Sequence, residues 1–129
     1  MRIAADTNVV VRYLVWDDTA QAEAAARAIE QAETVVLSAV VLCEVVWVLR
    51  RAYRYAPGEV VDVLRRLIES RTVEVDRPLA EAGLAMLAVG GDFAAGVIQA
   101  EAGRARCDRV VSFDQNFARL AAGIEVISP

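Results

Sequence analysis

The sequence predicts an α/β fold in which a mainly parallel central sheet of four or five short strands has helices on both faces. Short apolar segments of strand length alternate with longer segments of helical periodicity, which is typical of a parallel sheet with crossover helices. The chain has 129 residues, a hydrophobic fraction of 57% and no linker-like or repetitive segment. Residues 1–129 are therefore expected to form one domain.

The expected elements follow in order along the chain. Strands are expected at the short apolar runs Arg2–Ala5, Thr34–Leu37, Thr72–Val75, Arg109–Phe113 and Ile124–Ile127. Helices are expected where the composition or the apolar spacing is helical, at Thr19–Ala32, Ala39–Tyr55, Pro57–Ser70, Pro78–Val89 and Phe93–Arg106. The run Val9–Trp16 fits a strand or a helix, because a short apolar run does not define a period. Thr19, Ser38 and Asp92 are expected to cap the helices that they precede or open.

The amino-acid composition excludes several kinds of chemistry. The chain has no histidine and no lysine, and its 14 basic residues are all arginine. A Ser–His triad, a His-ligated zinc site, Schiff-base chemistry and a P-loop are therefore excluded. The net charge is −4, which disfavours general binding to nucleic acid unless the acids gather at one place and cations neutralise them there.

No targeting segment or apolar run long enough to cross a membrane is recognised, so a cytoplasmic protein is expected. Cys43 and Cys107 lie in no spaced motif, and a structural disulfide is not expected in a reducing compartment.

Asp6 and Asp114 each follow an expected strand. Ligands of open α/β sheets bind at the carboxyl ends of the strands, so two acids at that edge indicate a site. The alternative for each is an Asx turn or a helix cap. Asp92 opens an expected helix and could be only its N-cap, although that helix leads directly to the strand that carries Asp114.

Glu44 lies in the apolar run VVLCEVVWVL, and a helix so apolar all round should be largely buried. A buried carboxylate must be protonated, paired or bound to a cation, and a metal ligand is the preferred interpretation. The alternative is a buried ion pair, for example with Arg12. Carboxylates without histidine favour Mg²⁺ or Mn²⁺, which could activate water to hydrolyse a phosphodiester.

Three segments in order resemble the PIN-domain ribonucleases, and the toxin branch of the VapBC toxin–antitoxin systems is the most similar group. These segments are IAADTNVVVRYLVWDD, VVLSAVVLCEVVWVLRRAY and GGDFAAGVIQAEAGRARCDRVVSFDQNFARL. The resemblance implies a PIN-like three-layer sandwich and a metal-dependent endoribonuclease that acts as a VapC-type toxin. It also implies an RNA substrate, often transfer RNA, a cognate VapB-type antitoxin and a homodimer.

The resemblance further implies that Asp6, Glu44 and Asp114 bind Mg²⁺ or Mn²⁺ and converge on one cation. Supporting roles are implied for residues next to these acids, namely Thr7, Asn8, Ser112 and Asn116. Many relatives carry a further acid at the position of Ala95, and Asp92, one helical turn earlier, is expected to take over part of its role as a metal ligand and catalytic acid.

Ala95 motivates an alternative function, a catalytically weakened PIN-like module that acts mainly by binding its antitoxin. A third interpretation is a phosphoryl-transfer enzyme or receiver domain, which also places aspartates at strand ends. Those proteins usually need a lysine near the phosphate, and this chain has none.

Overall fold

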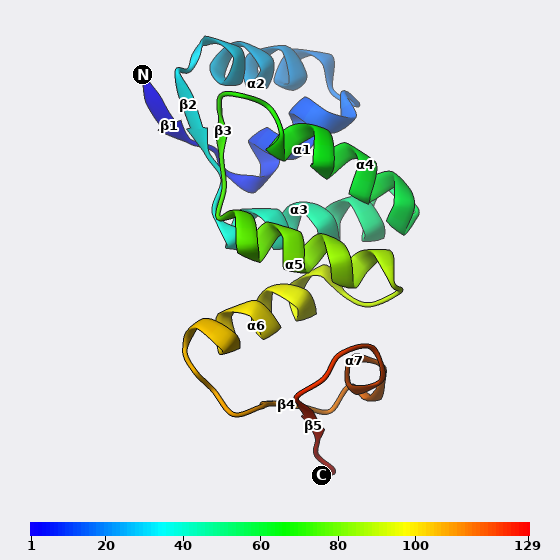
Figure 1. Ribbon diagram of the computed structural model, residues 1–129. Coiled ribbons are helices and arrows are strands. Elements are labelled where there is room, and N and C mark those ends of the chain that lie inside the picture. Colours follow the sequence, from blue (N-terminus) through cyan, green and yellow to red (C-terminus); the bar gives the residue numbers. More distant parts are fainter. The chain divides into compact units, whose positions relative to one another are not determined.

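The computed structural model describes residues 1–129 (Figure 1). Two compact units divide the chain, Met1–Asp76 (unit 1) and Arg77–Pro129 (unit 2). Each unit contains its own parallel sheet and its own buried apolar residues.

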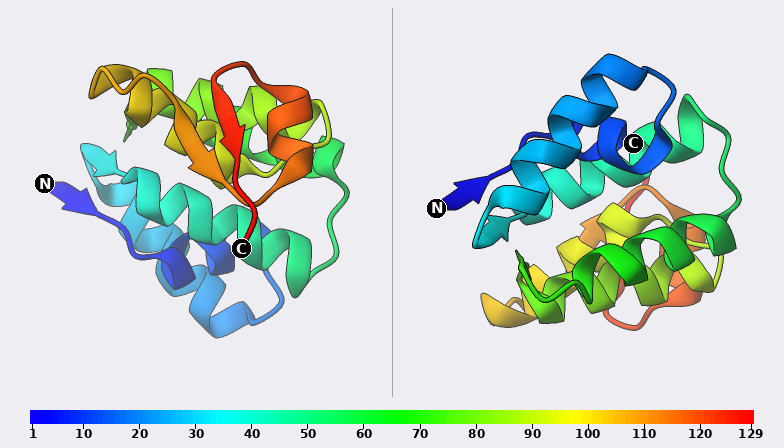
Figure 2. Two further views of the ribbon diagram at one scale, coloured as in Figure 1. Left: turned by 90° about the horizontal axis from the view of Figure 1, so that it is seen from below. Right: turned by 90° about the horizontal axis from the view of Figure 1, so that it is seen from above.

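Unit 1 is built around a three-stranded parallel sheet with the order β1-β2-β3. Its elements in chain order are β1 (Arg2–Ala4), α1 (Thr7–Val15), α2 (Thr19–Gln31), β2 (Thr34–Val36), α3 (Ala39–Arg51), α4 (Pro57–Ile68) and β3 (Val73–Glu74). In register, Ile3 lies opposite Val35, and Val35 lies opposite Val73. Two helices follow each of the first two strands, and α1 packs against both α2 and α3 (Figure 2).

The ambiguous run Val9–Trp16 is helical, because α1 begins directly after Asp6. The Asp6 carboxylate accepts a hydrogen bond from the Thr7 N–H, and the Val10 N–H bonds to the Asp6 carbonyl. Thr7, Val10 and Val11 are buried at helical spacing, so one face of this short helix joins the core.

Helix α3 begins after Ser38, whose hydroxyl accepts a hydrogen bond from the Val41 N–H, as the sequence predicts. The helix ends at Arg51, earlier than the expected Tyr55. For α2 the prediction of the cap is wrong. Thr19 is the first helical residue, and the Asp18 carboxylate before it accepts the capping bond from the Gln21 N–H.

Unit 2 contains α5 (Arg77–Ala88), α6 (Phe93–Arg104), β4 (Val110–Ser112), α7 (Gln115–Leu120) and β5 (Ile124–Val126). Helices α5 and α6 pack closely at Gly96, which has no side chain. A Cβ atom on this residue would lie 2.3 Å from the Ala82 carbonyl oxygen. Gly90, with φ +96°, follows the end of α5 in the left-handed region that favours glycine.

The α/β fold class is confirmed, with seven helices and five short strands that all pair in parallel. The expectation of one hydrogen-bonded sheet is corrected, because the strands form a three-stranded sheet in unit 1 and a two-stranded sheet in unit 2. Strands of two or three residues have few backbone N–H and C=O groups for pairing, and each strand pairs only with strands of its own unit. Helix α7 was not predicted, since its six residues are too few to show a period.

A polar network joins three elements of unit 1 at the C-terminal end of α1. Arg12 NH1 lies 3.1 Å from Asp17 Oδ1 and 3.0 Å from the Tyr53 hydroxyl, which donates to Asp17 Oδ2 at 2.6 Å. Arg12 Nε donates to Gln21 Oε1 of α2 at 2.6 Å. The hydrogen bond from Tyr53 lowers the pKa of Asp17, and the same bond raises the pKa of Tyr53.

These two pKa shifts predict how the network stabilises unit 1 as pH changes. The Asp17 contribution is present above the ordinary pKa of 3.8 and disappears as the pH falls through its lowered pKa. The Tyr53 contribution is present below the ordinary pKa of 10.0 and disappears as the pH rises through its raised pKa. Tyr53→Phe should therefore lower the free energy of unfolding most between these two limits.

The measurement is urea unfolding of the wild type and of Tyr53→Phe across the pH range. Tyr55→Phe is the matched control, because the structure shows no hydrogen bond from the Tyr55 hydroxyl. A difference between the wild type and Tyr53→Phe that stays constant from acid to alkaline pH would contradict the prediction.

Candidate active site

The first predicted acid lies at the carboxyl end of the sheet in unit 1. Asp6 follows β1 and is the N-cap of α1, where its Oδ1 accepts a hydrogen bond of 2.8 Å from the Thr7 N–H. The structure therefore gives Asp6 the capping role that the sequence left as an alternative. This bond occupies Oδ1 alone, and Oδ2 of the exposed side chain accepts no hydrogen bond from the chain.

Thr7 connects Asp6 to Glu44 of α3. Its hydroxyl donates a hydrogen bond of 3.2 Å to Glu44 Oε1, while its backbone N–H holds Asp6. Thr7 is the one buried polar residue of the chain, with an exposed fraction of 8%. Two acids that are 38 residues apart in the sequence thus share one buried threonine.

The expectation that Glu44 is buried is wrong, because its side chain is exposed. The buried face of α3 consists of Leu42, Val45, Val46 and Leu49. Glu44 lies on the other face, between Val40 and Trp47, which are 68% and 61% exposed. An apolar helix was expected to be buried all round, but α3 leaves apolar side chains in contact with solvent.

The alternative of a Glu44–Arg12 ion pair is also wrong, because Arg12 pairs with Asp17. Neither burial nor an arginine explains the acid at position 44. The contact that the structure shows for Glu44 is the hydrogen bond from the hydroxyl of Thr7, the residue after Asp6.

In unit 2, Asp114 repeats the arrangement of Asp6. It follows the parallel strand β4 and caps α7, where its Oδ1 accepts hydrogen bonds of 2.9 Å from the Asn116 N–H and 3.3 Å from the Phe117 N–H. The Ser112 hydroxyl accepts a hydrogen bond of 3.0 Å from the Asp114 N–H, so Ser112 shapes this turn. Oδ2 of Asp114 accepts no hydrogen bond from the chain.

Asn116 joins this turn to the loop that carries Asp92. Its side-chain Nδ2 donates a hydrogen bond of 3.4 Å to the Gly90 carbonyl. Asp92 is at the N-cap position of α6, but its exposed side chain makes no capping hydrogen bond. Capping therefore does not use the Asp92 carboxylate.

Ala95, the position where the resemblance implied an acid, lies in the apolar core of unit 2. It is 8% exposed and clusters with the buried residues Met86 and Phe117. A carboxylate at this position would be placed among apolar side chains, which is costly without a partner. The apolar side chain at position 95 therefore suits its surroundings in this chain.

The donor set of the predicted site fits a hard divalent cation. Asp6, Glu44, Asp92 and Asp114 are all exposed, and each has at least one carboxylate oxygen that the chain does not use. Oxygen ligands without histidine favour Mg²⁺ or Mn²⁺. No group of three or more acidic or cysteine side chains forms a cluster that could hold a metal ion. Unit 1 holds Asp6 with Glu44 and unit 2 holds Asp92 and Asp114, so the convergence of these acids stays a prediction.

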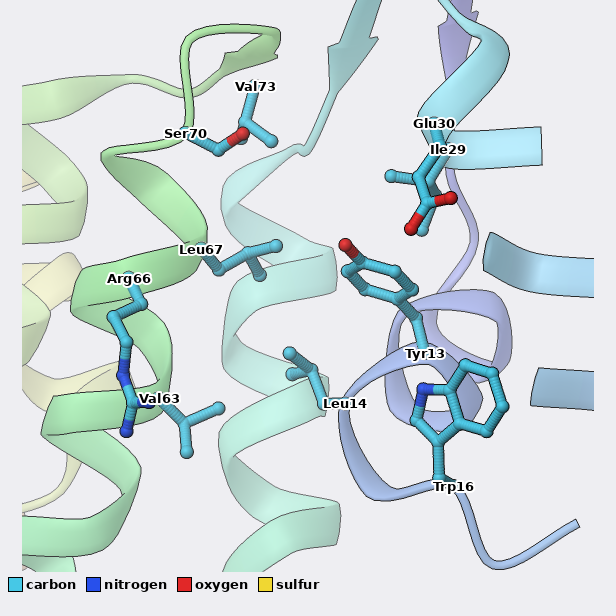
Figure 3. Close-up of a pocket in the computed structure, with 10 residues that line it drawn as sticks. All are labelled: Tyr13, Leu14, Trp16, Ile29, Glu30, Val63, Arg66, Leu67, Ser70 and Val73. Carbon is cyan, nitrogen blue, oxygen red and sulfur yellow. The ribbon is translucent and has the colours of Figure 1, made fainter. Parts of the chain in front are cut away.

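Two pockets open on unit 1. The larger one, of about 500 Å³, has a mostly apolar lining that includes Tyr13 and Trp16, with Glu30 and Arg66 among its side chains (Figure 3).

The second, of about 430 Å³, lies between α1 and α2 and begins at Asn8, two residues after Asp6. The resemblance implied a supporting role for Asn8, whereas Arg12 and Gln21 of this pocket were not predicted. The spacing of four residues between Asn8 and Arg12 could have indicated Arg12, because residues at this spacing share one face of a helix.

The sequence matches the PIN domain family over residues 3–123, and this match spans both units. The chain therefore belongs to the PIN domain family. This fold is generally that of a nuclease, and its members usually use divalent metal ions. No curated protein matches the sequence. No helix of the chain is long and apolar enough to cross a membrane.

The bridge through Thr7 predicts a specific effect of Thr7→Val on metal binding. Valine has nearly the shape of threonine and leaves the backbone bond to Asp6 in place, but it removes the hydrogen bond to Glu44. Loss of such an orienting contact typically costs 10- to 100-fold in metal affinity. We expect a loss of about that size for Mn²⁺, measured by isothermal titration calorimetry.

Thr7→Ser is the matched control, because it retains the hydroxyl and should bind Mn²⁺ within a few-fold of the wild type. If Thr7→Val and Thr7→Ser bind Mn²⁺ equally well, Thr7 does not organise the acids.

Proposed function

We propose that this protein is a metal-dependent endoribonuclease that hydrolyses phosphodiester bonds in RNA, and that it is the VapC-type toxin of a type II toxin–antitoxin pair. The single observation that carries the proposal is the Asp6–Thr7–Glu44 arrangement at the carboxyl end of a parallel sheet, in a chain of the PIN domain family. Transfer RNA is the substrate class that the resemblance favours.

In this proposal Asp6, Glu44, Asp92 and Asp114 hold Mg²⁺ or Mn²⁺ through their unused carboxylate oxygens. The bound cation would supply an activated water and stabilise the charge on the leaving oxygen. The other residues position these acids. Thr7 donates one hydrogen bond to Asp6 Oδ1 and one to Glu44 Oε1, and Ser112 accepts a hydrogen bond that holds the turn of Asp114.

Helix capping contributes to this positioning. Asp6 and Asp114 each use one oxygen to bind backbone N–H groups at a helix N-terminus, which fixes the rotamer of the side chain. The positive end of the helix dipole also favours the charged form of a carboxylate at that place. Each acid is thereby held with a second oxygen available for a cation.

A VapB-type antitoxin is part of the proposal, as is a homodimer. The larger pocket of unit 1 supports a protein partner, because Trp16 and other apolar side chains line it and Glu30 and Arg66 offer charges of both signs (Figure 3). An amphipathic segment could bury apolar residues there and pair with both charges.

The proposal predicts cleavage of purified transfer RNA in the presence of Mn²⁺ or Mg²⁺ and none in the presence of EDTA. Asp6→Asn, Glu44→Gln and Asp114→Asn keep the shape of each side chain and remove its charge. Each should lower the cleavage rate at least about 100-fold, because each removes the negative charge of a proposed metal ligand. Asp62→Asn is the control, since Asp62 is an exposed acid of α4 and its side chain has no partner in the structure.

Equal activity of Asp6→Asn and Asp62→Asn would refute the proposed site. The burial of Ala95 favours one other function, a catalytically weakened module that acts by binding its antitoxin. The antitoxin-binding function is favoured if neither the wild type nor Asp6→Asn cleaves cellular RNA in Mn²⁺.

A further inference from the structure

We propose that the pocket between α1 and α2 is a base-binding subsite that takes guanine of a single-stranded RNA in preference to adenine. This inference rests on the proposed nuclease function and names the part of the substrate that the protein reads. The inference is based on the start of the pocket at Asn8, two residues after Asp6, on the shape of its wall, and on the hydrogen-bonding groups that its polar side chains leave unused.

The pocket begins beside the candidate active site. Asp6 caps α1, and Asn8 and Arg12 follow on one face of that helix, one turn apart. One helical turn rises about 5.4 Å, so the α1 side of the pocket is little more than one turn long and starts at Asn8, two residues after Asp6. If a cation bound by Asp6 holds a phosphate of the RNA, as the proposed function requires, the neighbouring nucleotide could place its base in the pocket.

The opposite wall is formed by α2 and is unusually smooth. It consists of Gln21, Ala24, Ala25 and Ala28. Ala24 and Ala28 are exposed, although exposed positions of a helix usually carry long polar side chains. The methyl groups leave room for a flat ring, and the volume of about 430 Å³ lies within the range of small-ligand sites.

The polar side chains of the pocket present mainly hydrogen-bond donors. Arg12 uses Nε for Gln21 and NH1 for Asp17 and Tyr53, which leaves NH2. Gln21 uses Oε1 to accept from Arg12, which leaves its Nε2 donor. Asn8 is exposed and its amide has no partner in the structure. The ion pair and the Gln21 bond hold the Arg12 side chain in place before any ligand arrives.

A donor-rich pocket favours a base with adjacent acceptors. Guanine offers N7 and O6 next to each other, whereas adenine offers N7 beside an N6 amino group that is itself a donor. Adenine would place this amino group against Arg12 NH2 or Gln21 Nε2. Unstacked bases of single-stranded RNA expose these edges to protein side chains.

The test uses two 5′-fluorescein-labelled RNA hexamers, UUGUUU and UUAUUU, which differ in one base. Binding is measured by fluorescence anisotropy with Ca²⁺ in place of Mg²⁺, since Ca²⁺ takes the same oxygen ligands, and a gel verifies that the RNA stays intact. We expect the wild type to bind the guanine hexamer at least about 5-fold more tightly, the lower limit for one well-formed base contact.

Gln21→Glu is the decisive variant, because it retains Oε1 for Arg12 and replaces the Nε2 donor by an acceptor. It should reduce the guanine preference to about 1 or reverse it. Gln31→Glu introduces the same charge on α2 outside the pocket, so it should weaken both hexamers alike and keep the preference. Urea unfolding verifies that both variants are folded.

A wild type that binds both hexamers equally, or a Gln21→Glu variant that keeps the guanine preference, would overturn the subsite. If transfer RNA is still cleaved in Mn²⁺ and Asp6→Asn abolishes this cleavage, the subsite fails alone and the nuclease function stands. If neither hexamer binds and a partner protein protects Asn8 and Gln21 from solvent, the pocket is a protein-docking site and the inference is wrong.

Discussion

The arrangement of the candidate site in unit 1 depends on the two hydrogen bonds that Thr7 donates. Its backbone N–H holds Asp6, and its hydroxyl holds Glu44. The first bond requires α1 to start directly after Asp6, and the second requires α1 to pack against α3, since Glu44 lies on α3. The hydroxyl is buried, and an unpaired buried donor is costly. The sheet, the helix start and the acid pair are therefore coupled through one residue.

Unit 2 uses the same local device with different partners. An aspartate follows a parallel strand, caps the next helix with Oδ1, and leaves Oδ2 unused, at Asp114 as at Asp6. Capping and metal binding are thus compatible uses of one carboxylate, because a cap occupies a single oxygen. The interpretation of Asp6 and Asp114 as helix caps is therefore correct, and each cap leaves one carboxylate oxygen unused.

The chemistry of the chain reflects its charge distribution. The proposed function requires this acidic protein to keep its carboxylates where cations neutralise them and to offer hydrogen-bond donors where RNA would lie. In unit 1 the acids Asp6 and Glu44 are exposed, and the pocket that starts at Asn8 has two amides and Arg12 as its polar groups. Arginine suits this place, because its guanidinium stays charged and can hold several hydrogen bonds in a fixed geometry.

The sequence by itself determined the fold class, the order of the strands and longer helices, and which acids to suspect. Alternating apolar segments and caps such as Ser38 are local signals, and local signals can be read along the chain. The tertiary structure decided which side chains are exposed, which residues form pairs and which strands pair with one another. It exposed Glu44, paired Arg12 with Asp17, and divided five strands between two sheets. Periodicity gives the faces of a helix but not which neighbour covers each face, because that depends on residues distant in the sequence.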